Sequence, residues 1–351
     1  MDKRIILSVA GSGKTSFIID QLNNTERALL ITYTKNNYVN LRKKVINKFG
    51  FIPDTIQIYT YFDFVYSFCY KPYLYFRFSA KGINWDIPPS FTLKLKRNNP
   101  KFYMDNGRRL YHNRIAKLLE ATSSYEKINQ RIEKYFDYLF IDEVQDFGGH
   151  DFNLLMNIAN ANVRICLVGD FYQHTFETSN DGNVNSTLYS NLGKYKKRLV
   201  PKGISFDCCT LSNSYRCSPS VCKFIEVSFN ISISSHRKED TKVELVDNLD
   251  LVNQLFLCND IVKLFYQNHH KYPCFSENWG ASKGIDSYQD VCVVLNKSTY
   301  DLFKKNRLSE MNEKTKNKFY VACTRARGNL YFIPETSLKC FIDHGVRLGD
   351  S

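Results

Sequence analysis

The first 60 residues alternate short apolar runs with segments of helical spacing. Apolar residues gather at 5–9, 28–32 and 56–60, and each run has the length of a strand that is buried on both faces. Between these runs, residues 16–22 and 39–49 carry apolar side chains three and four positions apart, which predicts helices. Strands that alternate with helices in this way predict an α/β fold with a parallel sheet.

This alternation is interrupted once and then resumes. Residues 70–134 contain adjacent prolines, a basic cluster and a helical spacing near 109–120, and we interpret this stretch as an insertion. The apolar runs at 138–141 and 163–168 predict two further buried strands after it.

A second lobe is predicted from residue 201 onwards. Its strands are expected at 291–295 and 330–333, whereas residues 225–280 show no clear pattern and are interpreted as a short elaboration. The domain prediction is a first domain over 1–200 with an insertion at about 70–134, and a second domain over 201–351 with the elaboration at about 225–280.

Composition and charge narrow the class of protein. Hydrophobic residues make up 43% of the chain and aromatic residues 15%, which excludes a disordered chain. The formal net charge of +13 favours a polyanionic partner, although a solvated basic surface would give the same charge. Eleven cysteines include no Cys-x-x-Cys pair, and neither a signal peptide nor a membrane-spanning apolar run is found. We therefore expect a soluble, cytoplasmic protein that does not enter a membrane.

The first predicted strand runs into a glycine-rich loop and then a helix, which is the setting of a phosphate-binding loop. Glycines let backbone N–H groups approach phosphate oxygens, and the helix N-terminus favours negative charge. Lys14 is expected to reach the β- and γ-phosphates, and Thr15 to bind Mg²⁺. The alternative is a glycine turn without a ligand. The predicted nucleotide-binding residues of the loop are Ala10, Gly11, Ser12, Gly13, Lys14, Thr15 and Ser16.

Two carboxylates follow the apolar run at 138–141. Ligands of open α/β sheets bind outside the carboxyl ends of the strands, where Asp142 and Glu143 are expected. We predict that Asp142 binds Mg²⁺ through water and that Glu143 orients or deprotonates the attacking water.

Three longer segments carry a resemblance to a known family. They are Asp142-Glu-Val-Gln-Asp146, Gly169-Asp-Phe-Tyr-Gln173 and Tyr320-Val-Ala-Cys-Thr-Arg-Ala326. They resemble motifs of the UvrD/Rep-like branch of superfamily 1 DNA helicases, and the matches run from residue 5 to about 333. The resemblance implies two RecA-like P-loop NTPase domains in a compact form, with Mg²⁺ and ATP held between the two lobes.

The resemblance also implies roles at the nucleotide. Gln145 and Gln173 would sense the γ-phosphate, and Arg216 and Arg325 would act on it from the second lobe. The predicted catalytic residues are Lys14, Glu143, Gln173, Arg216 and Arg325. Gly284 and Asp286 match a segment whose acidic residue contacts the ribose. The adenine-reading glutamine that the family carries before the loop is not found, so the preference for ATP over other nucleotides stays open.

Five residues are predicted on the nucleic-acid side. Segments around Thr32 and around Thr60 and Tyr61 resemble those that grip single-stranded DNA. Tyr33 in the first of them, and Phe176 after Gln173, match base-stacking aromatics. Base stacking on an aromatic ring does not depend on sequence, which suits a motor. The alternative for each aromatic residue is packing in the core.

The resulting hypothesis is an ATP-dependent helicase or translocase that moves 3′→5′ on single-stranded DNA or a partial duplex. The direction follows from the resemblance, and also from His174-Thr175, because the opposite polarity class usually has Leu-Pro there. One alternative is a DNA-stimulated ATPase without unwinding activity of its own, serving partner proteins in a repair, mobile-element or defence complex. Others are a P-loop phosphotransferase acting on a small molecule, and a non-catalytic nucleic-acid binder.

Overall fold

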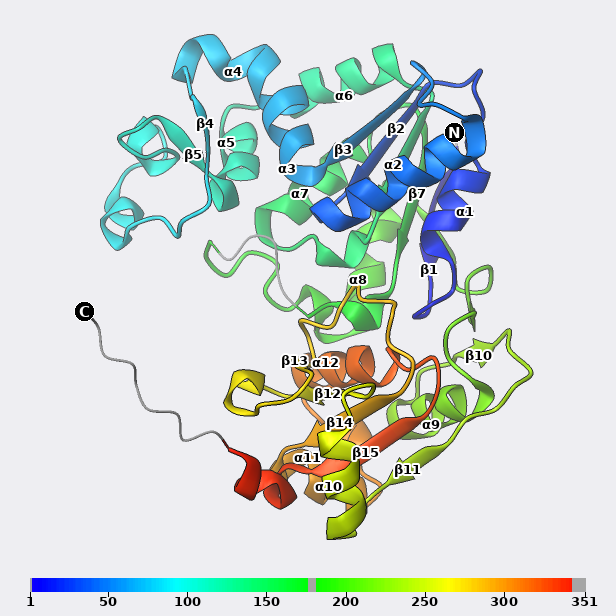
Figure 1. Ribbon diagram of the computed structural model, residues 1–351. Coiled ribbons are helices and arrows are strands. Elements are labelled where there is room, and N and C mark those ends of the chain that lie inside the picture. Colours follow the sequence, from blue (N-terminus) through cyan, green and yellow to red (C-terminus); the bar gives the residue numbers. More distant parts are fainter. Residues whose placement is uncertain (1, 176–180, 343–351) are drawn as a thin grey trace. The chain divides into compact units, whose positions relative to one another are not determined.

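A computed structural model describes residues 2–175 and 181–342, and these residues form two compact units (Figure 1). The first unit consists of the described residues within Met1–Leu7, Lys14–Phe171 and Phe176–Cys208. The second consists of the described residues within Ser8–Gly13, Tyr172–Thr175 and Cys209–Ser351. Each unit has its own parallel sheet with helices. The predicted fold class, an α/β protein with two domains that each have a parallel sheet flanked by helices, is confirmed. None of the described helices has the length and apolar character needed to span a bilayer.

The sheet of the first unit has six parallel strands in the order β3-β2-β6-β7-β1-β8. The central strands are continuous apolar runs and are buried along their whole length, as the sequence pattern predicts. The strands are β1 (Lys3–Leu7), β2 (Ala28–Thr32), β3 (Ile56–Thr60), β6 (Tyr138–Asp142), β7 (Arg164–Gly169) and β8 (Ser205–Asp207). Helices α1 (Lys14–Asp20), α2 (Lys35–Phe49), α7 (Gly149–Ile158) and α8 (Leu192–Leu199) accompany them.

The insertion leaves the first sheet at the end of β3 (Figure 1). A short helix α3 (Tyr61–Asp63) continues through a π-helical segment (Phe64–Tyr70) into α4 (Lys71–Phe78). Strands β4 (Gly82–Asn84) and β5 (Arg109–Tyr111) pair with each other, and α5 (Ile115–Ala121) and α6 (Tyr125–Tyr135) close the insertion. The helix predicted near 109–120 is wrong in its first half, because Arg109–Tyr111 pairs with β4 and the helix begins at Ile115.

The sheet of the second unit has five parallel strands in the order β11-β15-β14-β12-β13. They are β11 (Val243–Leu245), β12 (Val262–Phe265), β13 (Ser276–Asn278), β14 (Val291–Leu295) and β15 (Leu330–Pro334). A two-stranded sheet pairs β9 (Asn213–Ser214) with β10 (Ser234–Ser235). The helices are α9 (Pro219–Phe229), α10 (Leu249–Leu257), α11 (Lys297–Lys304) and α12 (Glu313–Cys323). The interpretation of 225–280 as an elaboration needs correction, because this stretch supplies three of the five strands.

Candidate nucleotide site

The glycine loop joins β1 to α1, and Lys14 is the first residue of that helix. Gly11 and Gly13 have φ angles of +71° and +84°, which favour glycine. A Cβ atom on Gly11 would lie only 2.6 Å from Cβ of Arg216, so a side chain does not fit there. Ser8 and Ser12 are buried, and their hydroxyl groups have no hydrogen-bond partner among the described residues. Buried hydroxyl groups without partners are costly, so this loop fits a ligand with many acceptor oxygens, such as a phosphate.

Residues 8–13 of the loop are held by backbone bonds within the second unit. The Val9 N–H donates to Leu211 O at 3.0 Å, and the Ala10 N–H donates to the Tyr320 hydroxyl at 3.0 Å. The Tyr215 N–H donates to Gly11 O at 2.9 Å. The N–H of Ala10 thus helps to fix the loop, and the predicted contact of Ala10 with the nucleotide stays a prediction.

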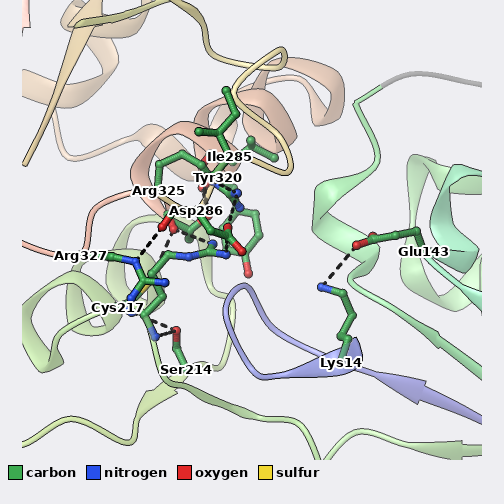
Figure 2. A network of polar contacts seen from close by, with 12 residues as sticks. Lys14, Glu143, Ser214, Cys217, Ile285, Asp286, Tyr320, Arg325 and Arg327 are labelled. Carbon is green, nitrogen blue, oxygen red and sulfur yellow. Dashed lines mark hydrogen bonds and ion pairs between the residues drawn. The ribbon is translucent and has the colours of Figure 1, made fainter. Parts of the chain in front are cut away.

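The two predicted carboxylates end the first unit's strand β6. Asp142 is buried, and its Oδ1 accepts the backbone N–H of Glu143 at 2.9 Å. Glu143 has a φ of +55°, an unusual conformation for a residue with a side chain, and its Oε1 lies 3.9 Å from Nζ of Lys14 (Figure 2). Burial, and then the charge of Glu143, raise the pKa of Asp142 to about 7. Two neighbouring carboxylates, one buried and one partly buried, lie near the ammonium group of Lys14, and a divalent cation such as Mg²⁺ would add positive charge there.

We expect the Asp142→Asn variant to unfold at a higher temperature than the wild type when NTP and Mg²⁺ are absent. A folded-state pKa near 7, against about 4 in the unfolded chain, means that ionising Asp142 costs stability. The cost grows from about pH 4 to pH 7 and reaches the order of 4 kcal/mol above that. Thermal unfolding at pH 8 should therefore show a midpoint raised by at least about 2 °C, with a smaller gain at pH 5. An unchanged or lower midpoint at pH 8 would contradict the burial of an ionised carboxylate here.

Gln145 links the acidic segment to the end of the neighbouring strand β7. Its Nε2 donates to the carboxylate of Glu143, and its Oε1 accepts the backbone N–H of Asp170 at 3.0 Å. A Cβ atom at Gly169 would clash with that same Oε1, which explains the glycine at this position. Gln145 therefore orients Glu143 within the first unit. Gln173, also buried, belongs to the short segment that groups with the second unit.

Arg216 and Arg325 come together in the second unit, although 109 positions separate them. Both guanidinium groups contact Oδ1 of Asp286. That of Arg325 lies 3.3 Å from this oxygen (Figure 2). Arg216 also donates to Thr324 O at 3.0 Å, and Arg325 Nε donates to Val321 O at 3.2 Å. Burial, and then the charge of Arg216, lower the pKa of Arg325 to about 10, so it stays protonated at neutral pH. The positive charge of two buried guanidinium groups, next to the exposed carboxylate of Asp286, favours an anionic ligand.

Asp286 thus holds the two arginines, whereas the sequence predicted a ribose contact. Gly284, two residues earlier, has a φ of +83° and nothing within 4 Å of a Cβ position, so the turn alone accounts for its glycine. The ribose contact stays a prediction.

Sequence reasoning missed Tyr215, which precedes Arg216. Its ring is 62% exposed and stacks on His236, with centroids 3.9 Å apart and an interplanar angle of 13°. A Cβ atom on Gly13 would lie 3.7 Å from Cε2 of this ring, which places the tyrosine beside the glycine loop. The signal was present in the sequence as an aromatic residue within a motif, but its exposure could not be predicted.

The predicted nucleic-acid residues of the first unit differ in accessibility. Tyr33 is half-buried, and its ring lies 6.3 Å from that of Tyr61 and 5.9 Å from that of Phe62. Tyr61 is a core residue packed edge-to-face on Phe147 at 4.9 Å, and Thr32 is also fully buried, so these two act as supports for the surface. Thr60 caps α3 by accepting the backbone N–H of Asp63. The predicted stacking residue Phe176 lies outside the described residues.

Comparison with known families decides the class of this site. Residues 97–334 match the family described as the viral superfamily 1 RNA helicase core domain, which is more than half of the chain. The chain belongs to this family. The matched part of the helicase core includes Asp142, Gln173, Arg216 and Arg325, whereas the glycine loop precedes it. The predicted assignment to superfamily 1 helicases is therefore confirmed. The match does not extend to the UvrD/Rep-like branch, which stays a prediction.

Two solved structures of arterivirus nonstructural protein 10, a helicase, are similar to this helicase core. The structure in complex with DNA has 16% sequence identity and a TM-score of 0.48, and the match covers 94% of this chain and 60% of the arterivirus chain. The other is a crystal structure of the helicase with 16% identity and a TM-score of 0.46, and the match covers 97% of this chain and 62% of that helicase. This chain therefore spans about 60% of the length of those helicases. Because both TM-scores are below 0.5, the roles of the site residues are not argued from these structures. A search of the curated proteins finds no match.

Proposed function

We propose that this helicase core is an NTP-driven motor that moves along single-stranded nucleic acid. The observation that carries the proposal is the pair of buried guanidinium groups of Arg216 and Arg325, which both contact the carboxylate of Asp286. A planar guanidinium stabilises charge that develops on a transferred phosphoryl group. A phosphotransferase for a small molecule would not require two such arginines beside the helicase motifs.

In the first unit, four residues would act at the nucleotide. Lys14 binds the phosphates, Thr15 and Asp142 hold the cation, and Glu143 orients or deprotonates the attacking water. The bond from Gln145 to Glu143 supports this last role, because it holds the carboxylate in one orientation. Mg²⁺, when bound, neutralises phosphate charge and polarises the transferred group. Gln173 is proposed to sense the γ-phosphate.

The base of the nucleotide is proposed to stack on Tyr215. This ring is exposed and beside Gly13, and its orientation is fixed by the stack on His236. Stacking on an aromatic face tolerates any base, so we expect GTP and other NTPs to serve as substrates as well as ATP.

Single-stranded DNA and RNA are both expected to bind. Stacking on Tyr33 and contacts to phosphate do not distinguish the two sugars, since discrimination requires a contact to the 2′-hydroxyl. The resemblance of the motifs favours DNA, whereas the family description names RNA. Movement is proposed in the 3′→5′ direction, on the basis of His174-Thr175 and the motif resemblance.

The proposal is tested by NTP hydrolysis with and without oligo(dT) or oligo(U), alongside unwinding of DNA and RNA duplexes with a 3′ or a 5′ single-stranded tail. Stimulated hydrolysis with unwinding of the 3′-tailed duplex is expected. Stimulation without unwinding would support the alternative of a motor that serves a larger complex. A hydrolysis rate that neither oligonucleotide changes would contradict the motor function and favour the phosphotransferase. Unwinding only of the 5′-tailed duplexes would show that the direction of movement is 5′→3′.

A further inference from the structure

An exposed tryptophan of the insertion lies beside the predicted nucleic-acid segment. Trp85 follows directly after β4 and is 60% exposed. Its ring meets Phe62 edge-to-face, with centroids 4.7 Å apart, and stacks on His112 with an interplanar angle of 27°. The indole is therefore held by two neighbours while a large part of it remains open to solvent.

This tryptophan ends a continuous row of aromatic rings. Tyr33, at the end of β2, lies 5.9 Å from Phe62, and Phe62 lies 4.7 Å from Trp85 and 5.8 Å from His112. Phe62 is buried and joins the two ends. We call Tyr33, Phe62, Trp85 and His112 the aromatic row. It connects a residue predicted to stack on a base with the surface of the insertion, within one unit.

The chain that follows Trp85 is basic and exposed. Residues 85–101 contain four basic residues, Lys94, Lys96, Arg97 and Lys101, and one acidic residue, Asp86. All four basic side chains are exposed, as are the apolar side chains of Phe91 and Leu93. Positive charge interleaved with exposed rings is the arrangement by which proteins hold single strands without reading their sequence.

We propose that Trp85 stacks on a base of single-stranded nucleic acid, and that Lys94, Lys96 and Arg97 contact the adjoining phosphates. The insertion would thereby extend the binding surface that begins at Tyr33. A protein partner fits less well, because protein-binding patches are depleted of lysine, whereas this segment is rich in it. This inference rests on the proposed function, since it names a further contact for the same ligand.

The two tryptophans of the chain make the proposal directly measurable. Trp279 is fully buried in the second unit, and its indole N–H donates to Leu264 O at 2.9 Å, whereas Trp85 is exposed. Titration of the full chain with oligo(dT) or oligo(U) should therefore quench the fluorescence of Trp85. The Trp85→Phe variant should bind the same oligonucleotides with little change in fluorescence.

Affinity gives a second readout, measured by the anisotropy of a labelled oligonucleotide. Trp85→Ala should weaken binding about five- to 150-fold, the range expected for loss of one stacked base, and Trp85→Phe should weaken it less. Lys96→Ala should reduce the salt dependence of binding by about one counterion, whereas Trp85→Ala should leave that slope unchanged. The matched control is Phe76→Ala on α4, which removes a 94% exposed ring outside the aromatic row and should not alter affinity.

The outcomes separate this inference from the proposed function. Tight binding by the wild type without quenching, together with unchanged affinity in Trp85→Ala, would overturn the role of Trp85 and leave the motor intact. If the wild type binds neither oligonucleotide, the proposed function itself fails. Should Trp85→Ala unfold in a thermal scan, the quenching comparison between the wild type and Trp85→Phe decides the question, because Trp85→Phe keeps an aromatic ring against Phe62 and His112.

Discussion

The Lys14→Ala variant is expected to lose NTP hydrolysis by about 100-fold to 1,000-fold or more, the range found when one preorganised donor to developing charge is removed. Lys14 begins α1, so its ammonium group lies at a helix N-terminus directly after the glycine loop. It is also the cation next to Glu143, at 3.9 Å. Removing it takes away a phosphate contact and leaves the two carboxylates without their positive neighbour. Steady-state hydrolysis with saturating oligonucleotide measures the loss.

A second readout distinguishes this role from a general loss of structure. Burial raises the pKa of Asp142, and the charge of Lys14 opposes that effect. Without Lys14 the pKa of Asp142 should rise further, so Mg²⁺ should bind more weakly at pH 7 and recover at higher pH, when the carboxylate is ionised. Lys297→Ala, a surface lysine at the start of α11, is the matched control and should hydrolyse NTP like the wild type. Hydrolysis retained by Lys14→Ala would remove the phosphate-loop assignment.

The sheets show which parts of the fold a sequence pattern can predict. Residues 28–32 and 56–60 form strands as predicted, because continuous apolar runs between helices have few other ways to be buried. Strand β5 was missed because Arg109–Tyr111 is held by pairing with β4, a partner some 27 residues earlier that local spacing does not reveal. The strands between 225 and 280 were missed for a similar reason, since β11 and β13 have only three residues each and depend on their neighbours in the sheet.

The candidate site shows the same limit in its side chains. Motifs picked out Lys14, Asp142, Arg216 and Arg325 as candidates, because phosphoryl transfer uses a lysine, a metal-binding carboxylate and arginines around the phosphates. They could not show that Asp286 contacts both arginines, since that contact joins residues 70 and 39 positions apart. The burial of a side chain could not be predicted from the motifs either. Tyr61, predicted at the nucleic-acid surface, is packed against Phe147 in the core. Exposure at Tyr215 and Trp85 likewise depends on neighbours that only the folded chain assembles.

The Arg325→Ala variant is expected to lower turnover by about 10³- to 10⁵-fold, as for arginines that stabilise the charge of a transferred phosphoryl group. The side chain of Arg325 is positioned at the end of α12 by bonds to Val321 O and Ile285 O, so little reorganisation is needed when a phosphate arrives. Burial and the charge of Arg216 already oppose its protonated form, which means that an anion brought to this pair gains a strong electrostatic attraction. Single-turnover hydrolysis, with nucleotide binding measured separately, identifies the step that is lost.

Two neighbouring variants test whether this loss is chemical or structural. Arg327→Ala removes an exposed guanidinium two residues away that donates to the backbone oxygen of Asp286 at 2.8 Å, so it perturbs the same segment without removing a buried cation. Its turnover should stay close to that of the wild type. Arg325→Lys keeps a positive charge but loses the planar fork, and it should recover only a small part of the activity, because a lysine reaches a phosphate as a point charge. Equal turnover in Arg325→Ala and the wild type would show that Arg325 only packs against Asp286, and the phosphoryl-transfer role would then rest on Arg216 alone.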